Sequence, residues 1–268
     1  MYDCKPVDLR SVKGRYKRGD RVAGHILGRY FQFGEYVKKD EEKAASIFVD
    51  LATQGHWGSK GRCHEYGFGP FLKNTEKSIE CYAQGVKEGD EISLSSLGLS
   101  VQHGKGGETD VKIAVDLFSQ AAEKGHADAL CNLGVCFRDG EGVDEDEKKA
   151  VVLFSQAADK GHLGAICNLA ACYQHGLGVD QDEKKAAALF CKVADKGHAE
   201  ATCNLGVCYG TGSGVKKDIK KAVALFSQAA EKGYAEAVCN LGVCYDTGSG
   251  VDKDEEKAAA LFSQAADE

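Results

Sequence analysis

The residue types in this sequence that most readily do chemistry are its twelve cysteines and eight histidines. Eight of the cysteines form four pairs in which the second follows the first by five residues: Cys131 and Cys136, Cys167 and Cys172, Cys203 and Cys208, Cys239 and Cys244. On a helix, residues five apart point about 140° away from each other, so the members of a pair cannot form a disulfide. Free cysteine packs as a small hydrophobic residue and persists in a reducing compartment. The pattern therefore predicts packed thiols in a cytoplasmic or nuclear protein.

Four histidines directly follow a glycine: His56, His126, His162 and His198. Zinc needs ligands at about 2.0–2.3 Å, whereas equivalent positions of stacked helices lie about 10 Å apart. Equivalent histidines, or equivalent cysteines, therefore cannot share one ion, and we expect no metal and no cofactor. We interpret each histidine as a turn residue that caps a helix end.

The adjacent residues Cys63, His64 and Glu65 include a nucleophile and a base. Neighbouring residues of a helix point apart, and a catalytic pair is normally brought together by the fold. A nucleophile also needs an oriented base. We therefore expect a protein that is not an enzyme.

The elements that position these residues repeat along the chain. The stretch 129–142, ALCNLGVCFRDGEG, returns at 165–178, 201–214 and 237–250, with a period of 36 residues that is typical of repeat architectures. Glycines recur where a helix would end: Gly19, Gly55, Gly89, Gly125, Gly161, Gly197 and Gly233. Residues that favour the N-cap position recur where another helix would begin: Asp40, Asn74, Asp110, Asp146, Asp182, Asp218 and Asp254. Aromatic residues recur inside that helix: Phe48, Tyr82, Phe118, Phe154, Phe190, Phe226 and Phe262.

Each unit therefore predicts two antiparallel helices, which in the clearest copy cover 127–139 and 147–160. Gly134 in the first helix has no side chain, so we expect a second helix to approach it closely. The fold class that follows is all-α, a solenoid of about seven helix pairs over residues 19–268, after an N-terminal half-unit or frayed cap at 1–18. We place the units at about 19–54, 55–88, 89–124, 125–160, 161–196, 197–232 and 233–268.

The unit pattern is clearest at 197–222, with Gly197-His198-Ala199, Leu205-Gly206, Tyr209, Gly212-Ser213-Gly214-Val215, Asp218 and Lys221-Ala222. It resembles the Sel-1-like repeat, a relative of the tetratricopeptide repeat, over about residues 19–268. The resemblance implies a right-handed α-solenoid that serves as an adaptor or scaffold. A secreted, cysteine-rich branch of that family bridges the two helices of each repeat and has members described as β-lactamases. Here the second helices contain only Cys81 and Cys191, so we expect neither those disulfides nor the hydrolase activity.

One polar column precedes the Leu-Gly pair of the first helix: Asn132, Asn168, Asn204 and Asn240, with Ser96 in the matching place. In related tetratricopeptide domains an asparagine here faces the inner groove and holds the backbone of a bound peptide. An amide can do this because it both donates and accepts hydrogen bonds. The alternative is that each asparagine bonds a neighbouring helix or loop within the solenoid. Both alternatives stay open.

Two exposed positions that follow the helix aromatic, Arg138 and Gln174, differ from their equivalents in other units. Tuning to one extended partner and neutral drift would both produce this variation. Together with the asparagine column and Ser96, these residues are the candidates for binding a protein or peptide on the concave face.

The bulk composition excludes other partner classes. The net charge is −7 with both signs interspersed, which argues against nucleic acid. No run approaches the roughly 18 apolar residues of a membrane span, and the first residues lack an apolar signal core. A second function remains as an alternative, because Leu261, Phe262 and Ala265 present an inner-type apolar face with no following unit. That face predicts self-assembly into a homo-oligomer.

Overall fold

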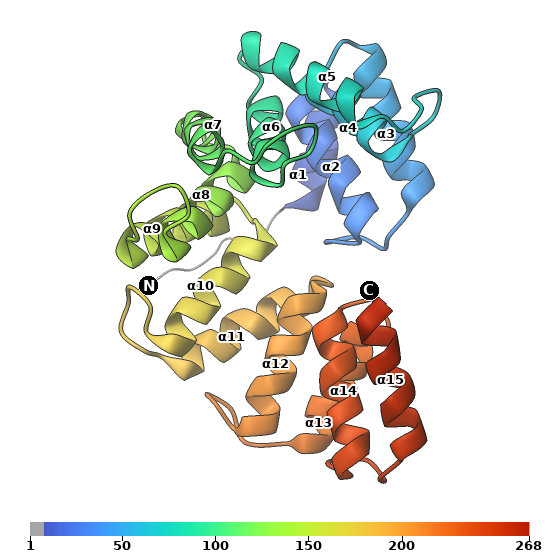
Figure 1. Ribbon diagram of the computed structural model, residues 1–268, viewed down its shortest axis with the longest axis vertical. Helices are drawn as coiled ribbons and strands as arrows, with labels where there is room; N and C mark the ends of the chain where they lie inside the picture. The colour runs from blue at the N-terminus through green and yellow to red at the C-terminus, as the bar shows by residue number, and fades with distance from the viewer. Residues whose placement is uncertain (1–7, 268) are drawn as a thin grey trace. The chain divides into compact units, whose positions relative to one another are not determined.

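The computed structural model describes residues 8–267, which form fifteen α-helices and, within that range, no strand (Figure 1). This confirms the predicted all-α class. The chain divides into two compact units, Met1–Ala165 and Ile166–Glu268. Both are built from the same helix pair, so the repeat sets the local structure throughout.

The first unit contains α1 to α9 and the start of α10. Their bounds are α1 Leu9–Lys17, α2 Arg21–Phe33, α3 Glu41–Thr53, α4 Trp57–Tyr66, α5 Thr75–Lys87, α6 Glu91–Gln102, α7 Val111–Glu123, α8 Ala127–Asp139, α9 Glu147–Asp159 and α10 Leu163–His175. The predicted first helix of the clearest copy is α8, residue for residue, and the second is α9, one residue shorter than predicted. Of the predicted N-terminal half-unit, α1 is helical and residues 1–7 lie outside the described range.

The second unit contains the rest of α10 and five further helices. Their bounds are α11 Glu183–Ala194, α12 Ala199–Thr211, α13 Ile219–Ala230, α14 Ala235–Thr247 and α15 Glu255–Asp267. Throughout the chain, even-numbered helices from α2 onwards are the first members of the repeat pairs, and odd-numbered helices from α3 onwards are the second.

Side chains at the helix starts satisfy backbone N–H groups that have no partner inside the helix. Asp146 accepts the N–H of Lys149 at 2.9 Å, and the other members of the predicted N-cap column do the same at their own helices. The histidines after the glycines also cap, but at the start of the following helix. His162 Nδ1 accepts the N–H of Ala165 at 2.9 Å, and His56, His126 and His198 behave likewise at 3.2–3.4 Å. An imidazole that accepts at Nδ1 carries its proton on Nε2.

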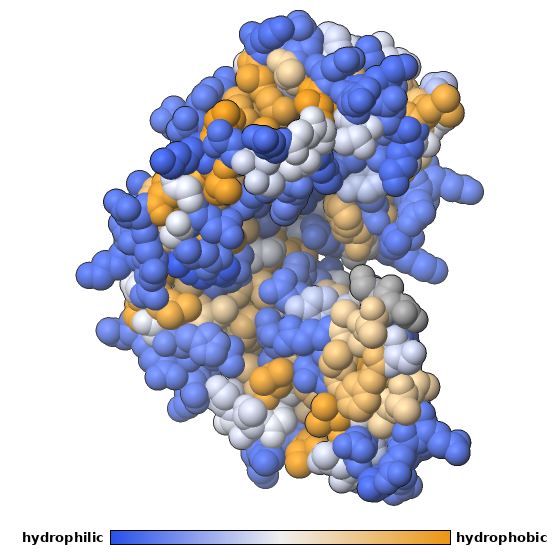
Figure 2. All heavy atoms as spheres, viewed as in Figure 1, coloured by the Kyte–Doolittle hydropathy of each residue, from blue (hydrophilic) through white to orange (hydrophobic). Residues whose placement is uncertain are grey.

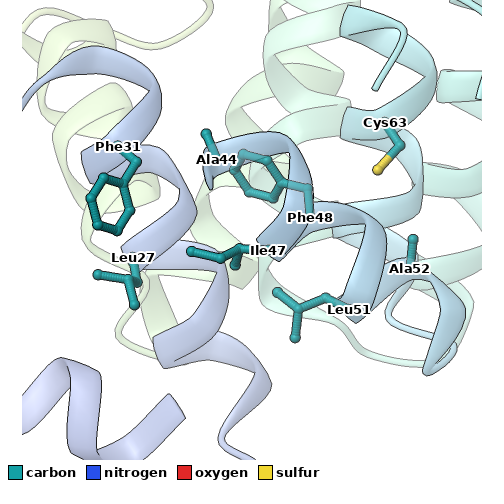
Figure 3. Packing of buried hydrophobic residues seen from close by; sticks show 8 residues of the cluster. All are labelled: Leu27, Phe31, Ala44, Ile47, Phe48, Leu51, Ala52 and Cys63. Carbon is teal, nitrogen blue, oxygen red and sulfur yellow. The ribbon is translucent and has the colours of Figure 1, made fainter. Parts of the chain in front are cut away.

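Glycine permits the close helix packing that the Leu-Gly pair predicts. A Cβ on Gly134 would lie 2.7 Å from the ring of Phe154, which is fully buried. The glycines at the same position of the other repeats meet their own aromatic ring equally closely, except in the fifth repeat, where Ala170 takes the place of glycine. Figure 3 shows the aromatic ring of the first repeat, Phe48 of α3, between Leu27 of α2 and Cys63 of α4.

The last aromatic of the column differs from the others in exposure. Phe262 on α15 is 40% exposed, whereas the six preceding members are buried. Ala259, Ala260 and Ala266 on the same helix are also exposed. Figure 2 shows apolar side chains gathered over α14 and α15.

Candidate binding cavity in the first unit

A cavity of about 290 Å³ lies within the first unit, and its walls come mainly from the first helices of four repeats, α2, α4, α6 and α8. Most of the side chains that line it are polar or charged. Those used below are His25, Arg29, Arg62, Glu65, Ser96, Lys105, His126, Asp128, Asn132 and His162.

The centre of the cavity wall is an ion pair between residues 99 positions apart in the sequence. Arg29 on α2 donates to Asp128 Oδ2 on α8, and both side chains are largely buried, at 22% and 23% exposed. His162 Nε2 lies 3.0 Å from the other oxygen, Asp128 Oδ1. Burial opposes the charge on Asp128, but Arg29 and His162 outweigh it and hold the pKa of this carboxyl well below its usual range. Asp128 is therefore a carboxylate at neutral pH.

A second contact joins the same parts of the unit. The hydroxyl of Tyr36, just after α2, donates to the carbonyl of Gly161 at 2.7 Å. Tyr36 has a positive φ of 59°, the only non-glycine residue in the described range to do so. The backbone before α3 is thus held in an uncommon conformation at the point where it reaches the start of α10.

Two buried side-chain donors of residues that line the cavity lack a hydrogen-bond partner. They are Arg29 Nε and Asn132 Nδ2, and they are the only such side-chain atoms within residues 8–267. Both are donors, and both belong to residues that line the cavity. Leaving a buried donor unpaired costs about 1–3 kcal/mol. Arg29 and Asn132 therefore each have a donor that lacks an acceptor oxygen.

The charges around the cavity favour an anion. Arg29, Arg62 and Lys105 are three cations that face two carboxylates, Glu65 and Asp128. Lys105 Nζ lies 2.9 Å from Glu65 Oε1, so that pair is neutralised. Arg62 donates from Nε to the side-chain amide oxygen of Gln32 on α2 at 3.0 Å, and this partner is neutral. Among these five residues, Arg62 thus leaves one uncompensated positive charge, in a chain whose net charge is −7.

The histidines at the wall differ in the direction of their pKa shifts. Burial lowers the pKa of His126, and lowers that of His25 well below its usual range, so both rings are neutral at pH 7. For His162, burial acts in the same direction, but Cys131 and Asp128 outweigh it and raise the pKa to about 10. Its Nδ1 meanwhile accepts the N–H of Ala165, so protonation of His162 requires the loss of that cap. The charge in the cavity and the start of α10 are therefore coupled.

The structure brings two of the predicted binding residues, Ser96 and Asn132, to this cavity. The other three asparagines lie in the second unit. Asn204 Nδ2 lies 3.7 Å from Cys167 Sγ, and Asn240 Nδ2 lies 3.4 Å from Cys203 Sγ, so each donates to the cysteine of the preceding first helix. Asn168 is half-buried on α10. The asparagines of the column therefore differ in their hydrogen-bond partners, and their role in binding stays a prediction.

The variable positions also have partners inside the chain. Arg138 donates from Nε and an Nη atom to the two oxygens of its neighbour Asp139, at 2.7 and 2.8 Å. The backbone carbonyl of Gln174 accepts a hydrogen bond from the side-chain amide of Gln181 at 2.9 Å.

Sequence reasoning missed Arg29, Arg62 and Asp128, although one signal for the arginines was present. The residue after the packed glycine of the first helix is apolar in the later repeats, as in Leu99, Val135 and Val207, but it is arginine in the first two repeats. A charge at an otherwise apolar position indicates a local function. Asp128 gave no comparable signal, because acidic residues are common in the first turn of a helix.

The side chains of Cys63, His64 and Glu65 have different surroundings in the structure. Burial raises the pKa of the Cys63 thiol to about 12, which keeps it protonated. His64 Nδ1 lies 3.2 Å from the carbonyl of Leu72, and Glu65 accepts from the hydroxyl of Tyr82 at 2.9 Å. His64 and Glu65 thus each bond a partner outside the triplet, and Cys63 is a buried, protonated thiol.

The repeat unit matches a known family along almost the whole chain. The sequence model of the Sel1 repeat matches seven consecutive stretches: 25–56, 57–90, 93–126, 127–162, 164–198, 199–234 and 235–268. The chain belongs to the Sel1 repeat family. Proteins built from Sel1 repeats commonly act as scaffolds for protein–protein interaction.

Solved structures agree with this assignment. A Sel1 repeat protein from Oxalobacter formigenes is 26% identical, with a TM-score of 0.72, over 90% of this chain and 96% of that one. The protein c5321, a protective antigen present in uropathogenic Escherichia coli strains, is 27% identical with a TM-score of 0.59, over 98% of this chain and 56% of that one. The immunity protein Pa5087 from Pseudomonas aeruginosa shares the fold. It is 18% identical with a TM-score of 0.57, over 80% of this chain and 81% of that one. No curated protein sequence gives a significant match.

Among the helices of residues 8–267, none is long and apolar enough to cross a membrane.

Proposed function

We propose that this Sel1 repeat protein is a non-catalytic interaction scaffold whose first unit binds a carboxylate of a protein partner. The carboxylate belongs to an acidic side chain or to the end of a chain. The single observation that carries the proposal is the pair of unpartnered buried donors, Arg29 Nε and Asn132 Nδ2, at the wall of one cavity.

The chemistry of the cavity supports an acidic ligand over other classes. Acceptor oxygens would satisfy these donors, and a hydrogen bond to a charged group contributes about 1.5–3 kcal/mol. The uncompensated positive charge of Arg62 adds attraction for the same ligand. A basic or purely apolar side chain in the cavity would offer neither donor an acceptor.

The size of the cavity supports an anchor rather than a whole peptide. Ligand pockets for drug-sized molecules span about 300–1,000 Å³, and this cavity, at about 290 Å³, lies at their lower limit. One or two side chains fit such a space. The rest of the partner would then lie on the open surfaces of the repeats, where Arg138 and Gln174 are candidates for further contact.

A selection from a random peptide library tests the proposal, followed by fluorescence polarisation with the selected peptides. We expect the purified chain to enrich peptides that contain aspartate, glutamate or an essential free C-terminus. The decisive variant is Asn132→Asp, which keeps the side-chain shape but replaces the unpaired donor by a negative oxygen. We expect it to weaken binding at least about tenfold, which corresponds to ~1.4 kcal/mol.

The matched control is Asn240→Asp. Asn240 occupies the same position of its repeat but lies in the second unit and donates to Cys203. We expect this variant to bind the selected peptides as the unmodified chain does. Enrichment of peptides without any carboxylate preference, or equal effects of the two variants, would refute the proposal.

A second function, self-association, is favoured by the exposed apolar residues of α15. Phe262 is 40% exposed beside three exposed alanines. An exposed apolar patch of this kind often marks an interface. Light scattering at several concentrations would test it: we expect association that the Phe262→Ser variant abolishes, and a concentration-independent monomer would exclude it.

The thiols support the cellular location that the sequence indicated. No disulfide joins the eleven cysteines of the described range, and nine of them are buried. Because reduced thiols persist in reducing surroundings, we propose a cytoplasmic protein.

A further inference from the structure

The second unit contains a cluster of potential metal ligands, separate from the cavity of the first unit. The Sγ atom of Cys167, a ring nitrogen of His198 and a carboxylate oxygen of Glu200 lie within 4.8 Å of one another. Within residues 8–267, no other group of three such residues comes this close. We propose that these three residues bind a zinc ion.

Local structure positions each ligand. Cys167 lies on α10 and is 1% exposed, so its sulfur is fixed by packing. His198 is the N-cap of α12, and Glu200 lies in the first turn of the same helix. The first helices of two consecutive repeats thus supply the three ligands.

The donor set fits zinc better than other common ions. Thiolate and imidazole are ligands of zinc, whereas calcium and magnesium prefer sites made of oxygen alone. A tetrahedral zinc ion holds its ligand atoms about 3.5 Å apart, given bonds of about 2.0–2.3 Å. The present separations are within 4.8 Å, and rotation of the half-buried Glu200 and His198 side chains can shorten them. A water molecule would supply the fourth ligand from the solvent side.

The surrounding groups are consistent with a coordinated sulfur. Asn204 Nδ2 lies 3.7 Å from Cys167 Sγ and is directed to it as a donor, as second-layer groups of metal sites commonly are. His198 Nδ1 accepts the N–H of Ala201 at 3.4 Å, a long hydrogen bond, so we infer that Nε2 is the ligand. On binding, the imidazole proton moves from Nε2 to Nδ1, this weak cap is given up, and the thiol releases its proton to solvent.

The neighbouring repeats explain why only one site forms. One period later, the equivalent residues are Cys203, Tyr234 and Glu236, where tyrosine replaces the histidine and donates to Glu236 at 3.2 Å. One period earlier, the position of the acid is occupied by Gly164. Only the set at Cys167 has all three ligand types in register.

Cobalt(II) is the probe for the test, because a cobalt–thiolate bond gives charge-transfer absorption that free cobalt lacks. The chain should first carry Cys4→Ser, Cys191→Ser and Cys239→Ser, which remove the two exposed thiols and the one outside the described residues. After dialysis against a chelator, we expect cobalt to bind at one equivalent per chain with thiolate absorption, and zinc to displace it.

Three substitutions assign the ligands. We expect Cys167→Ser to abolish the thiolate absorption, and Glu200→Gln to raise the dissociation constant at least tenfold. The matched control Cys203→Ser, at the same position of the next repeat, should change neither, and circular dichroism should confirm that each variant is folded. Absence of thiolate absorption in the parent chain, its persistence in Cys167→Ser, or unchanged affinity in Glu200→Gln would each overturn the proposal.

A gain of binding provides an independent check that does not depend on removing a buried residue. The substitution Tyr234→His places an imidazole between Cys203 and Glu236, in the register of the proposed site. We expect the cobalt stoichiometry to rise from one to two. A ratio that stays at one would refute the argument from register.

Discussion

Replacing Asp128 by asparagine removes the negative charge that Arg29 and His162 share at the cavity wall. Removing one member of a fully buried ion pair costs about 3–5 kcal/mol. The two side chains of the pair are 22% and 23% exposed, so part of the remaining charge on Arg29 stays solvated. We therefore expect Asp128→Asn to lower the free energy of unfolding of the first unit by about 2–3 kcal/mol.

The same substitution should affect binding in the opposite direction. Without the carboxylate of Asp128, the positive charge of Arg29 is no longer compensated and is available to a ligand. We expect acidic peptides to bind Asp128→Asn about tenfold more tightly, ~1.4 kcal/mol, although the protein is less stable. A simple loss of structure would weaken both properties, so the opposite signs distinguish the two explanations.

The chain offers a local reporter for this experiment. Its single tryptophan, Trp57, lies on α4 in the first unit, so the fluorescence change during urea unfolding follows that unit. The control is Asp139→Asn, which breaks an ion pair between neighbouring surface residues and should cost less than about 1 kcal/mol. A loss below about 0.5 kcal/mol for Asp128→Asn, or weaker binding of acidic peptides, would refute the reasoning.

Three further predictions concern the framework. Burial lowers the pKa of His126 below the value of the unfolded chain. Its contribution to the free energy of unfolding should therefore be complete above about pH 6.5 and decline as the pH falls towards the folded-state pKa. His126→Asn keeps a capping acceptor and should flatten this pH dependence, as measured by urea unfolding at pH 5 to 7. Gly206→Ala should lower the free energy of unfolding by about 1–3 kcal/mol, since the added Cβ would lie 2.6 Å from the ring of Phe226. Thermal unfolding measures this loss, and a neutral effect would show that the ring can move. Tyr36→Phe should cost about 1 kcal/mol in the Trp57 transition through loss of the bond to Gly161, and an unchanged midpoint would mean that water replaces it.

The sequence was sufficient to predict the helix pair, because its boundaries depend on local chemistry. Asp146 as N-cap, Gly161 at the helix end and Gly134 beneath Phe154 each act within one repeat or between neighbours. The histidines show the limit of that reasoning. Their place after a glycine suggested a cap, but only the three-dimensional course of the turn shows that His162 caps the following helix.

The cavity and the ligand cluster could not be predicted in the same way. Arg29 meets Asp128 because small rotations accumulate over three repeats, and no single repeat encodes their sum. The spacing between equivalent residues excludes an ion shared by several cysteines or by several histidines. It carries no information about Cys167 of one repeat beside His198 of the next.

The contacts of Arg29 with Asp128 and of Tyr36 with Gly161 have an evolutionary consequence. Repeat arrays ordinarily gain or lose whole units by duplication and deletion, because each unit depends only on its neighbours. In the first unit, one extra copy between these residues would move each partner away by the length of a repeat and break both bonds. The number of repeats between Arg29 and Gly161 is therefore constrained.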